Sequence, residues 1–97
     1  MKREVNKVDT IEFLGEENFL QICRNQNLSI QEIKTTREII EKWDETMKIK
    51  DQEERMAKKI VIAAEKIADF SLEERGRILK ALQAVTSLFV QLVRSRQ

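Results

Sequence analysis

The sequence predicts a small, single-domain, all-α protein, and three observations lead to this class. Proline is absent and glycine occurs only twice in 97 residues. Because proline is disfavoured inside helices and useful in turns, this composition is typical of long helices joined by few, short loops. No segment alternates apolar and polar residues as a half-buried strand does, and the chain is long enough for only one modest core. We therefore expect a bundle of about four helices over residues 1–97.

The first expected helix spans residues 10–25. Asp9 stands where an N-cap is needed, and Glu12 follows three residues later. A capping side chain accepts a hydrogen bond from a backbone N–H that has no partner within the helix, which is worth about 1 kcal/mol. Gly15 is the point at which this helix can split or kink.

The second and third expected helices span residues 30–48 and 52–68. Ser29 and Glu32 predict a capping box at the start of the second helix, and Asp51 is a weaker cap for the third. No helix breaker separates the two segments, so one long helix is the alternative. The apolar heptad of the second segment does not continue in phase into the third, and this shift favours a break near Asp51.

The fourth expected helix spans residues 72–94 and begins with a second capping box, formed by Ser71 and Glu74. Its apolar residues cover a wider arc than the single stripe that a surface helix requires. We expect it to form a tight antiparallel hairpin with the third helix, over residues 52–94, and this hairpin to be the core of a homodimer. The predicted interface residues are Val85, Leu88, Phe89, Leu92 and Val93.

The composition argues against an enzyme and against a cofactor. The chain has no histidine, one cysteine and two glycines, so it lacks the residues for a catalytic triad, a zinc site or a phosphate-binding loop. The lone Cys23 cannot form an intrachain disulfide and fits a reducing compartment. Neither a signal-peptide core in the first six residues nor an apolar run of about 18–20 residues is evident, so we expect a cytoplasmic protein without membrane contact.

Residues 22–33 carry the most informative pattern. Ile22, Cys23, Leu28, Ser29 and Ile33 stand at the spacing of two helices joined by a tight turn. Asn27 occupies the turn, and asparagine is one of the few residues that tolerate a left-handed conformation.

This pattern resembles the helix-turn-helix of bacterial and phage DNA-binding proteins, over residues 16–37. Two features depart from that family: Asn27 stands where glycine is usual, and Thr36 stands where a larger aliphatic residue is usual. The resemblance implies that the second helix of the motif enters the major groove. The residues that it implies for DNA contact are Arg24, which would reach the flanking DNA backbone, and five residues on or beside the groove-facing surface: Ser29, Gln31, Lys34, Thr35 and Arg37. The resemblance places Glu32 on this surface as well.

Side-chain chemistry fits these implied roles: Gln31 suits adenine edges, whereas Lys34 and Arg37 suit guanine or phosphate. The net charge is only +1, so binding of double-stranded DNA would need a local basic surface and would be helped by dimerisation. The first functional hypothesis is therefore a bacterial or phage transcriptional regulator that binds DNA as a dimer. The alternative is a helical protein-interaction module, either an adaptor, an assembly factor or an inhibitor. Glutamates that interrupt the basic residues, such as Glu38 and Glu41, would favour this alternative.

Overall fold

The computed structural model describes residues 8–96 of the chain. Residues 1–6, on which the expectation about a signal peptide rests, lie outside this range. All regular secondary structure in this range is helical, in the order α1 (Thr10–Leu14), α2 (Glu16–Asn25), α3 (Ile30–Glu45), the 3₁₀ turn η1 (Thr46–Lys48), α4 (Gln52–Lys66) and α5 (Leu72–Ser95). The predicted all-α class is confirmed.

The predicted helix starts are confirmed by their caps. The side chains of Asp9, Ser29, Asp51 and Ser71 each accept a hydrogen bond from the backbone N–H three residues later. Gly15 separates α1 from α2 with φ of 100°, a conformation that side chains rarely adopt. The first expected helix is therefore split into two, and the break expected near Asp51 is present.

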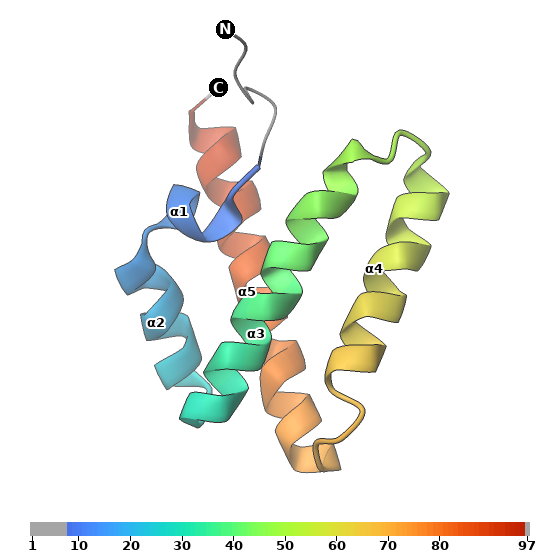
Figure 1. Cartoon of the computed structure of the whole chain (residues 1–97). Coiled ribbons are helices and arrows are strands. Elements are labelled where there is room, and N and C mark those ends of the chain that lie inside the picture. Colours follow the sequence, from blue (N-terminus) through green and yellow to red (C-terminus); the bar gives the residue numbers. More distant parts are fainter. Residues whose placement is uncertain (1–7, 97) are drawn as a thin grey trace, which may run out of the picture.

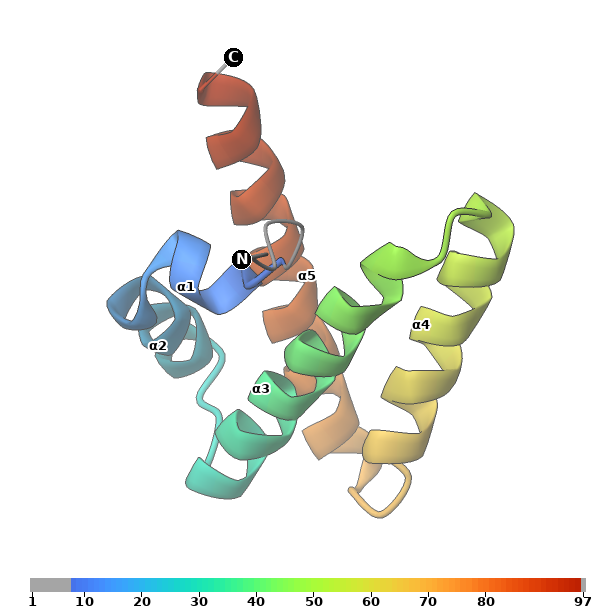
Figure 2. The same cartoon turned by 45° about the horizontal axis from the view of Figure 1, so that its top comes forward.

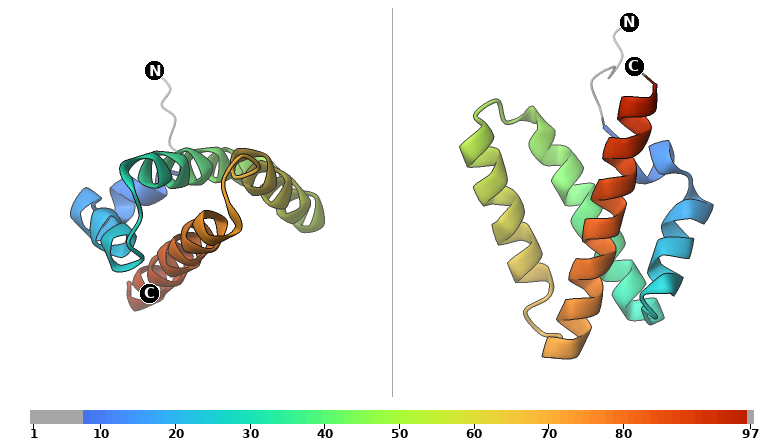
Figure 3. Two further views of the ribbon diagram at one scale, coloured as in Figure 1. Left: turned by 90° about the horizontal axis from the view of Figure 1, so that it is seen from below. Right: turned by 180° about the vertical axis from the view of Figure 1, so that it is seen from behind.

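Helix α3 lies at the centre of the molecule (Figure 1). It packs against α1, α4 and α5, while α2 packs against α1 and α5. Seen from below, α3 crosses above α5, with α1 and α2 at one end of it and α4 at the other (Figure 3, left). The core between these helices includes Phe19, Cys23, Ile39, Ile78 and Val85.

The expected tight hairpin of the last two helices is not what the structure shows. Helix α4 packs mainly on α3 and η1 rather than on α5, and the two helices diverge from the turn that joins them (Figure 2). The physical reason is that Trp43 of α3 takes the place beside α4. Its indole Nε1–H donates a 2.9 Å hydrogen bond to the carbonyl oxygen of Lys59.

Candidate functional site

The segment that resembles a helix-turn-helix has the expected local geometry. Asn27 adopts φ of 58°, the left-handed conformation that the turn needs. The N–H of Leu28 donates back to the carbonyl oxygen of Cys23 over 3.1 Å, which closes the end of α2. Ser29 and Glu32 form the reciprocal capping box at the start of α3. A tight turn between two capped helices is thus confirmed.

Three of the six residues predicted to contact DNA are exposed, and their side chains form no hydrogen bond or ion pair with the other described residues. Arg24 ends α2, and Gln31 and Lys34 lie in the first turns of α3. Ser29 is exposed as well, but its hydroxyl already accepts the N–H of Glu32 at 3.1 Å. These positions surround the turn and form the most accessible part of the predicted surface.

The prediction that Thr35 contacts DNA is wrong, because its side chain points into the molecule and is only 5% exposed. Its neighbour Thr36 is fully buried, and its hydroxyl donates to the carbonyl oxygen of Glu32 at 2.8 Å. Glu32 was expected on the groove-facing surface too, yet it is buried and ion-paired with Arg77 of α5. The helix face that periodicity assigned to solvent is therefore covered by α5 at its start.

The side chain of Arg37 is already bound by another residue of the same chain. Its guanidinium donates two hydrogen bonds to the carboxylate of Glu16 in α2 and lies 4.9 Å from the ring centre of Phe19. The hydrogen bond from Arg37 lowers the pKa of Glu16, which keeps that carboxylate ionised beside it. A phosphate would have to displace this carboxylate, so Arg37 serves first to tie α2 to α3.

The outward stripe of α3 is acidic rather than basic. Lys34 is followed on the same face by Glu38, Glu41 and Glu45, at intervals of four, three and four residues. Lys42 contributes a second positive charge nearby, but it lies 4.0 Å from Glu45. The interruption by glutamates that would favour a protein partner over DNA is thus present.

The predicted dimer interface on α5 is largely used inside the chain. Val85 belongs to the core, and Leu88, Phe89 and Leu92 pack against it. The ring of Phe89 meets that of Phe13 in α1 edge to face, with centroids 5.3 Å apart. Only Val93 of the five has no contact in this cluster. The wide apolar arc of α5 is explained by burial against α1, α2 and α3 of the same chain, so these five residues do not require a second chain to cover them.

An apolar groove opens where α4 leaves α5. It measures about 440 Å³, and seven of its eight lining residues carry no charge. Met56, Ile60 and Leu79 form its exposed rim, with Ile60 66% and Leu79 46% exposed. The full lining consists of Trp43, Met56, Lys59, Ile60, Ala63, Ala64, Ile67 and Leu79.

The apolar stripe of α4 is only partly buried. Met56, Ile60, Ala63 and Ile67 have the spacing of a core-facing stripe, and only Ala63 and Ile67 are buried. The one charged side chain of the groove, Lys59, places its ammonium group 4.8 Å from the ring centre of Trp43. The groove is therefore an apolar surface whose single cation already lies against an aromatic ring.

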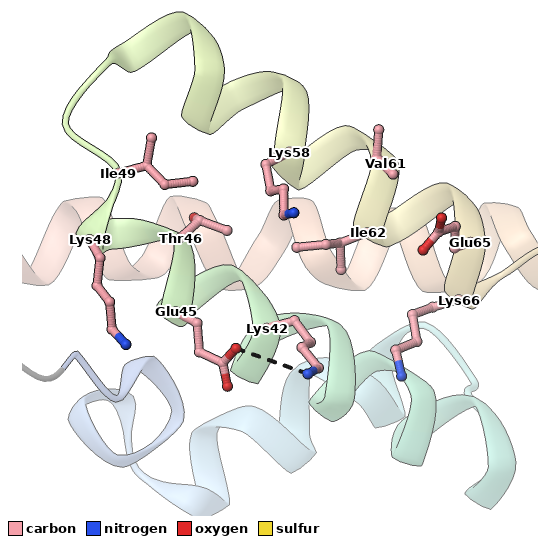
Figure 4. Close-up of a pocket in the computed structure, with 10 residues that line it drawn as sticks. All are labelled: Lys42, Glu45, Thr46, Lys48, Ile49, Lys58, Val61, Ile62, Glu65 and Lys66. Atoms are coloured by element: carbon pink, nitrogen blue, oxygen red, sulfur yellow. Dashed lines mark ion pairs between the residues drawn. The ribbon is translucent and has the colours of Figure 1, made fainter.

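A second pocket, of about 540 Å³, lies on the opposite side of α4 (Figure 4). Four lysines and two glutamates surround an apolar floor that includes Ile49 and Ile62. Lys42 is paired with Glu45, and Lys66 lies 3.7 Å from Glu38. Two of the four lysines are thus matched by carboxylates of the same chain, whereas Lys48 and Lys58 form no ion pair with the described residues.

Within residues 8–96, acidic and cysteine side chains nowhere gather into a group of three that could hold a metal ion. No helix in that range has both the length and the apolar character needed to cross a membrane. Comparison of the chain with protein-family models, with curated proteins and with solved structures finds no match.

Proposed function

We propose that this chain is a non-catalytic protein-interaction module that binds an apolar helix in the groove between α4 and α5. The observation that carries the proposal is the exposed rim of Met56, Ile60 and Leu79 around a floor of Trp43 and Ile67. Large apolar side chains gathered in a concavity are costly in water, and such patches mark interaction sites.

The chemistry of the groove favours a helical ligand. Its lining comes mainly from α4, together with Trp43 of α3 and Leu79 of α5, so that one apolar face of a ligand helix can contact several of these side chains. Helix-in-groove recognition works in this way: apolar side chains at intervals of three and four residues enter a hydrophobic cleft. A phosphate backbone would find only the cation of Lys59 here, and that cation lies against Trp43.

DNA binding is the second candidate, favoured by the exposure of Arg24, Gln31 and Lys34 around the turn at Asn27. It ranks lower because phosphate contacts need free cations, and the ion pair of Arg37 with Glu16 removes one of those that the resemblance implied. The glutamates that follow Lys34 along α3 add repulsion on the same face.

Site-specific photo-cross-linking in cells tests the two candidates side by side. A photoreactive phenylalanine analogue at position 60 lies on the groove rim, and the same analogue at position 34 lies on the outer face of α3. We expect covalent protein adducts of defined mass from position 60 and no nucleic-acid adduct from position 34. Nucleic-acid adducts from position 34, together with none of any kind from position 60, would overturn the proposal.

A further inference from the structure

The second pocket, between α3 and α4, has walls that are fixed by hydrogen bonds within the chain. Its lining comes from the end of α3, from η1 and the turn after it, and from one face of α4. The guanidinium of Arg55 donates a 2.7 Å hydrogen bond to the carbonyl oxygen of Ile49, and the N–H of Ile49 donates to the carbonyl oxygen of Thr46 at 2.9 Å. The indole of Trp43 ties α3 to α4. A ligand would therefore meet walls that do not have to be ordered on binding.

The floor of this pocket is apolar and consists of Ile49, Val61 and Ile62, with Val61 50% exposed. The hydroxyl of Thr46, which also lines the pocket, already donates to the carbonyl oxygen of Trp43 at 2.6 Å. The backbone of an extended peptide would leave polar groups unpaired over this floor, whereas an aliphatic chain has no such groups. The volume of about 540 Å³ lies within the range of roughly 300–1,000 Å³ that is usual for small-molecule sites. The floor therefore fits a small ligand with an apolar body.

The charges around the floor leave one net positive charge. The ion pairs of Lys42 and Lys66 with glutamates cancel two of the four lysine charges. Lys48 and Lys58 remain, together with Glu65, and none of these three forms an ion pair with the described residues. A ligand with a single negative charge balances this excess, whereas a doubly charged phosphate monoester exceeds it.

The unmatched charges also give the ligand a direction. Lys48 lies at the end of the pocket next to the turn that joins η1 to α4, and Lys58 extends from α4 towards Ile62 on the floor (Figure 4). Glu65 lies at the other end of the pocket, near the end of α4, and repels an anion there. An anionic group is therefore favoured on the side of the two lysines.

We infer that this pocket binds a small organic monoanion with an unbranched apolar body, the class to which aliphatic carboxylates belong. The carboxylate lies on the side of Lys48 and Lys58, and the chain covers Val61 and Ile62. Burial of the chain supplies most of the affinity, because ion pairs with exposed lysines are screened by water. The site is independent of the groove assigned to a helical partner, since the two linings share no described residue.

Methyl NMR of the full chain, with isotope-labelled isoleucine δ1 methyl groups, tests the inference. Ile49 and Ile62 report on the pocket, and Ile60, in the groove on the other side of α4, is the internal control. Titration with hexanoate, octanoate and decanoate should shift the first two signals and leave that of Ile60 unchanged. Each added pair of methylenes should tighten binding about tenfold, because one methylene that leaves water contributes roughly a factor of three to four.

Two further ligands separate the contributions of charge and of apolar contact. Octyltrimethylammonium has a similar chain and the opposite charge, and inorganic phosphate has negative charge and no chain. Neither should shift the signals of Ile49 and Ile62 at concentrations at which octanoate does. The inference is overturned if either ligand shifts them as octanoate does, if decanoate shifts neither, or if the Ile60 signal responds to decanoate before they do.

Reversing the charge of Lys58 provides a matched pair of variants. Lys58→Glu replaces an attraction for the carboxylate with a repulsion and should weaken octanoate binding about fivefold at low salt. Lys80→Glu makes the same change in net charge at an exposed position of α5 outside both linings, and it should leave binding unchanged. Because both lysines are exposed, circular dichroism should show unchanged helicity. Equal affinity of the two variants for octanoate would show that the assigned place of the carboxylate is wrong.

Discussion

The carboxylate of Glu32 links α3 to α5 through Arg77, and removing its charge should destabilise the protein. It is 1% exposed and accepts three hydrogen bonds, from Nη2 of Arg77 at 2.7 Å, from Nε of Arg77 at 3.2 Å and from the N–H of Ser29 at 3.0 Å. The hydrogen bonds from Arg77 lower the pKa of Glu32. Burial opposes them, and the N–H of Ser29 and the charge of Arg77 lower the pKa further.

Glu32→Gln keeps the shape and removes the charge. Only one terminal atom of glutamine can still accept, and its NH₂ group must face one of the donors. A hydrogen bond to a charged group contributes about 1.5–3 kcal/mol. Because the side chain of Arg77 is 35% exposed and partly screened by water, we expect the lower part of that range: a loss of about 2 kcal/mol in the free energy of unfolding at pH 7.

Urea unfolding followed by circular dichroism, at neutral and at acid pH, measures this loss. The pKa of Glu32 is lower in the folded state than in the unfolded state. Its stabilising contribution is therefore complete above the unfolded pKa and is lost as the pH falls through the folded pKa. The glutamine does not titrate, so the difference between the two proteins should close in acid.

Glu41→Gln, on the exposed face of α3, is the matched control and should change stability little. If the Glu32→Gln variant is as stable as the wild type at pH 7, or if the difference persists undiminished in acid, the tie between α3 and α5 is not electrostatic.

Three further predictions concern individual side chains. Cys23 is fully buried, and burial raises its pKa to about 11, so a thiol reagent should label it only on unfolding; rapid labelling of the folded chain would mean that α2 is rotated from the orientation described. Gly15→Ala should destabilise the chain by about 1 kcal/mol or more in thermal unfolding, because alanine is strained at φ of 100°; an unchanged midpoint would show that α1 and α2 can join differently. If the chain binds duplex DNA, replacing Arg24 and Lys34 with alanine should lower the salt dependence of affinity by about one unit for each lost contact, and a wild type that binds no DNA at low salt would dismiss that function.

The local features of this protein could be predicted from the sequence because they depend on residues close together in the chain. A capping box such as Ser29 with Glu32 spans one helical turn, and the left-handed turn at Asn27 depends on the residue itself. The helix starts, the split at Gly15 and the tight turn between α2 and α3 were accordingly predicted correctly.

Which apolar face is buried could only be decided by the tertiary structure. Periodicity places Ile60 and Val85 on apolar stripes alike, yet Val85 is in the core and Ile60 is exposed. The difference arises because α1 and α2 fold back onto α5, whereas α4 is held beside α3 through Trp43 and leaves its other side open. Thr35 and Glu32 are buried for the same reason, since α5 covers the start of α3. The candidate site is therefore the groove between α4 and α5 rather than the start of α3. This difference arises from packing between helices that are distant in sequence.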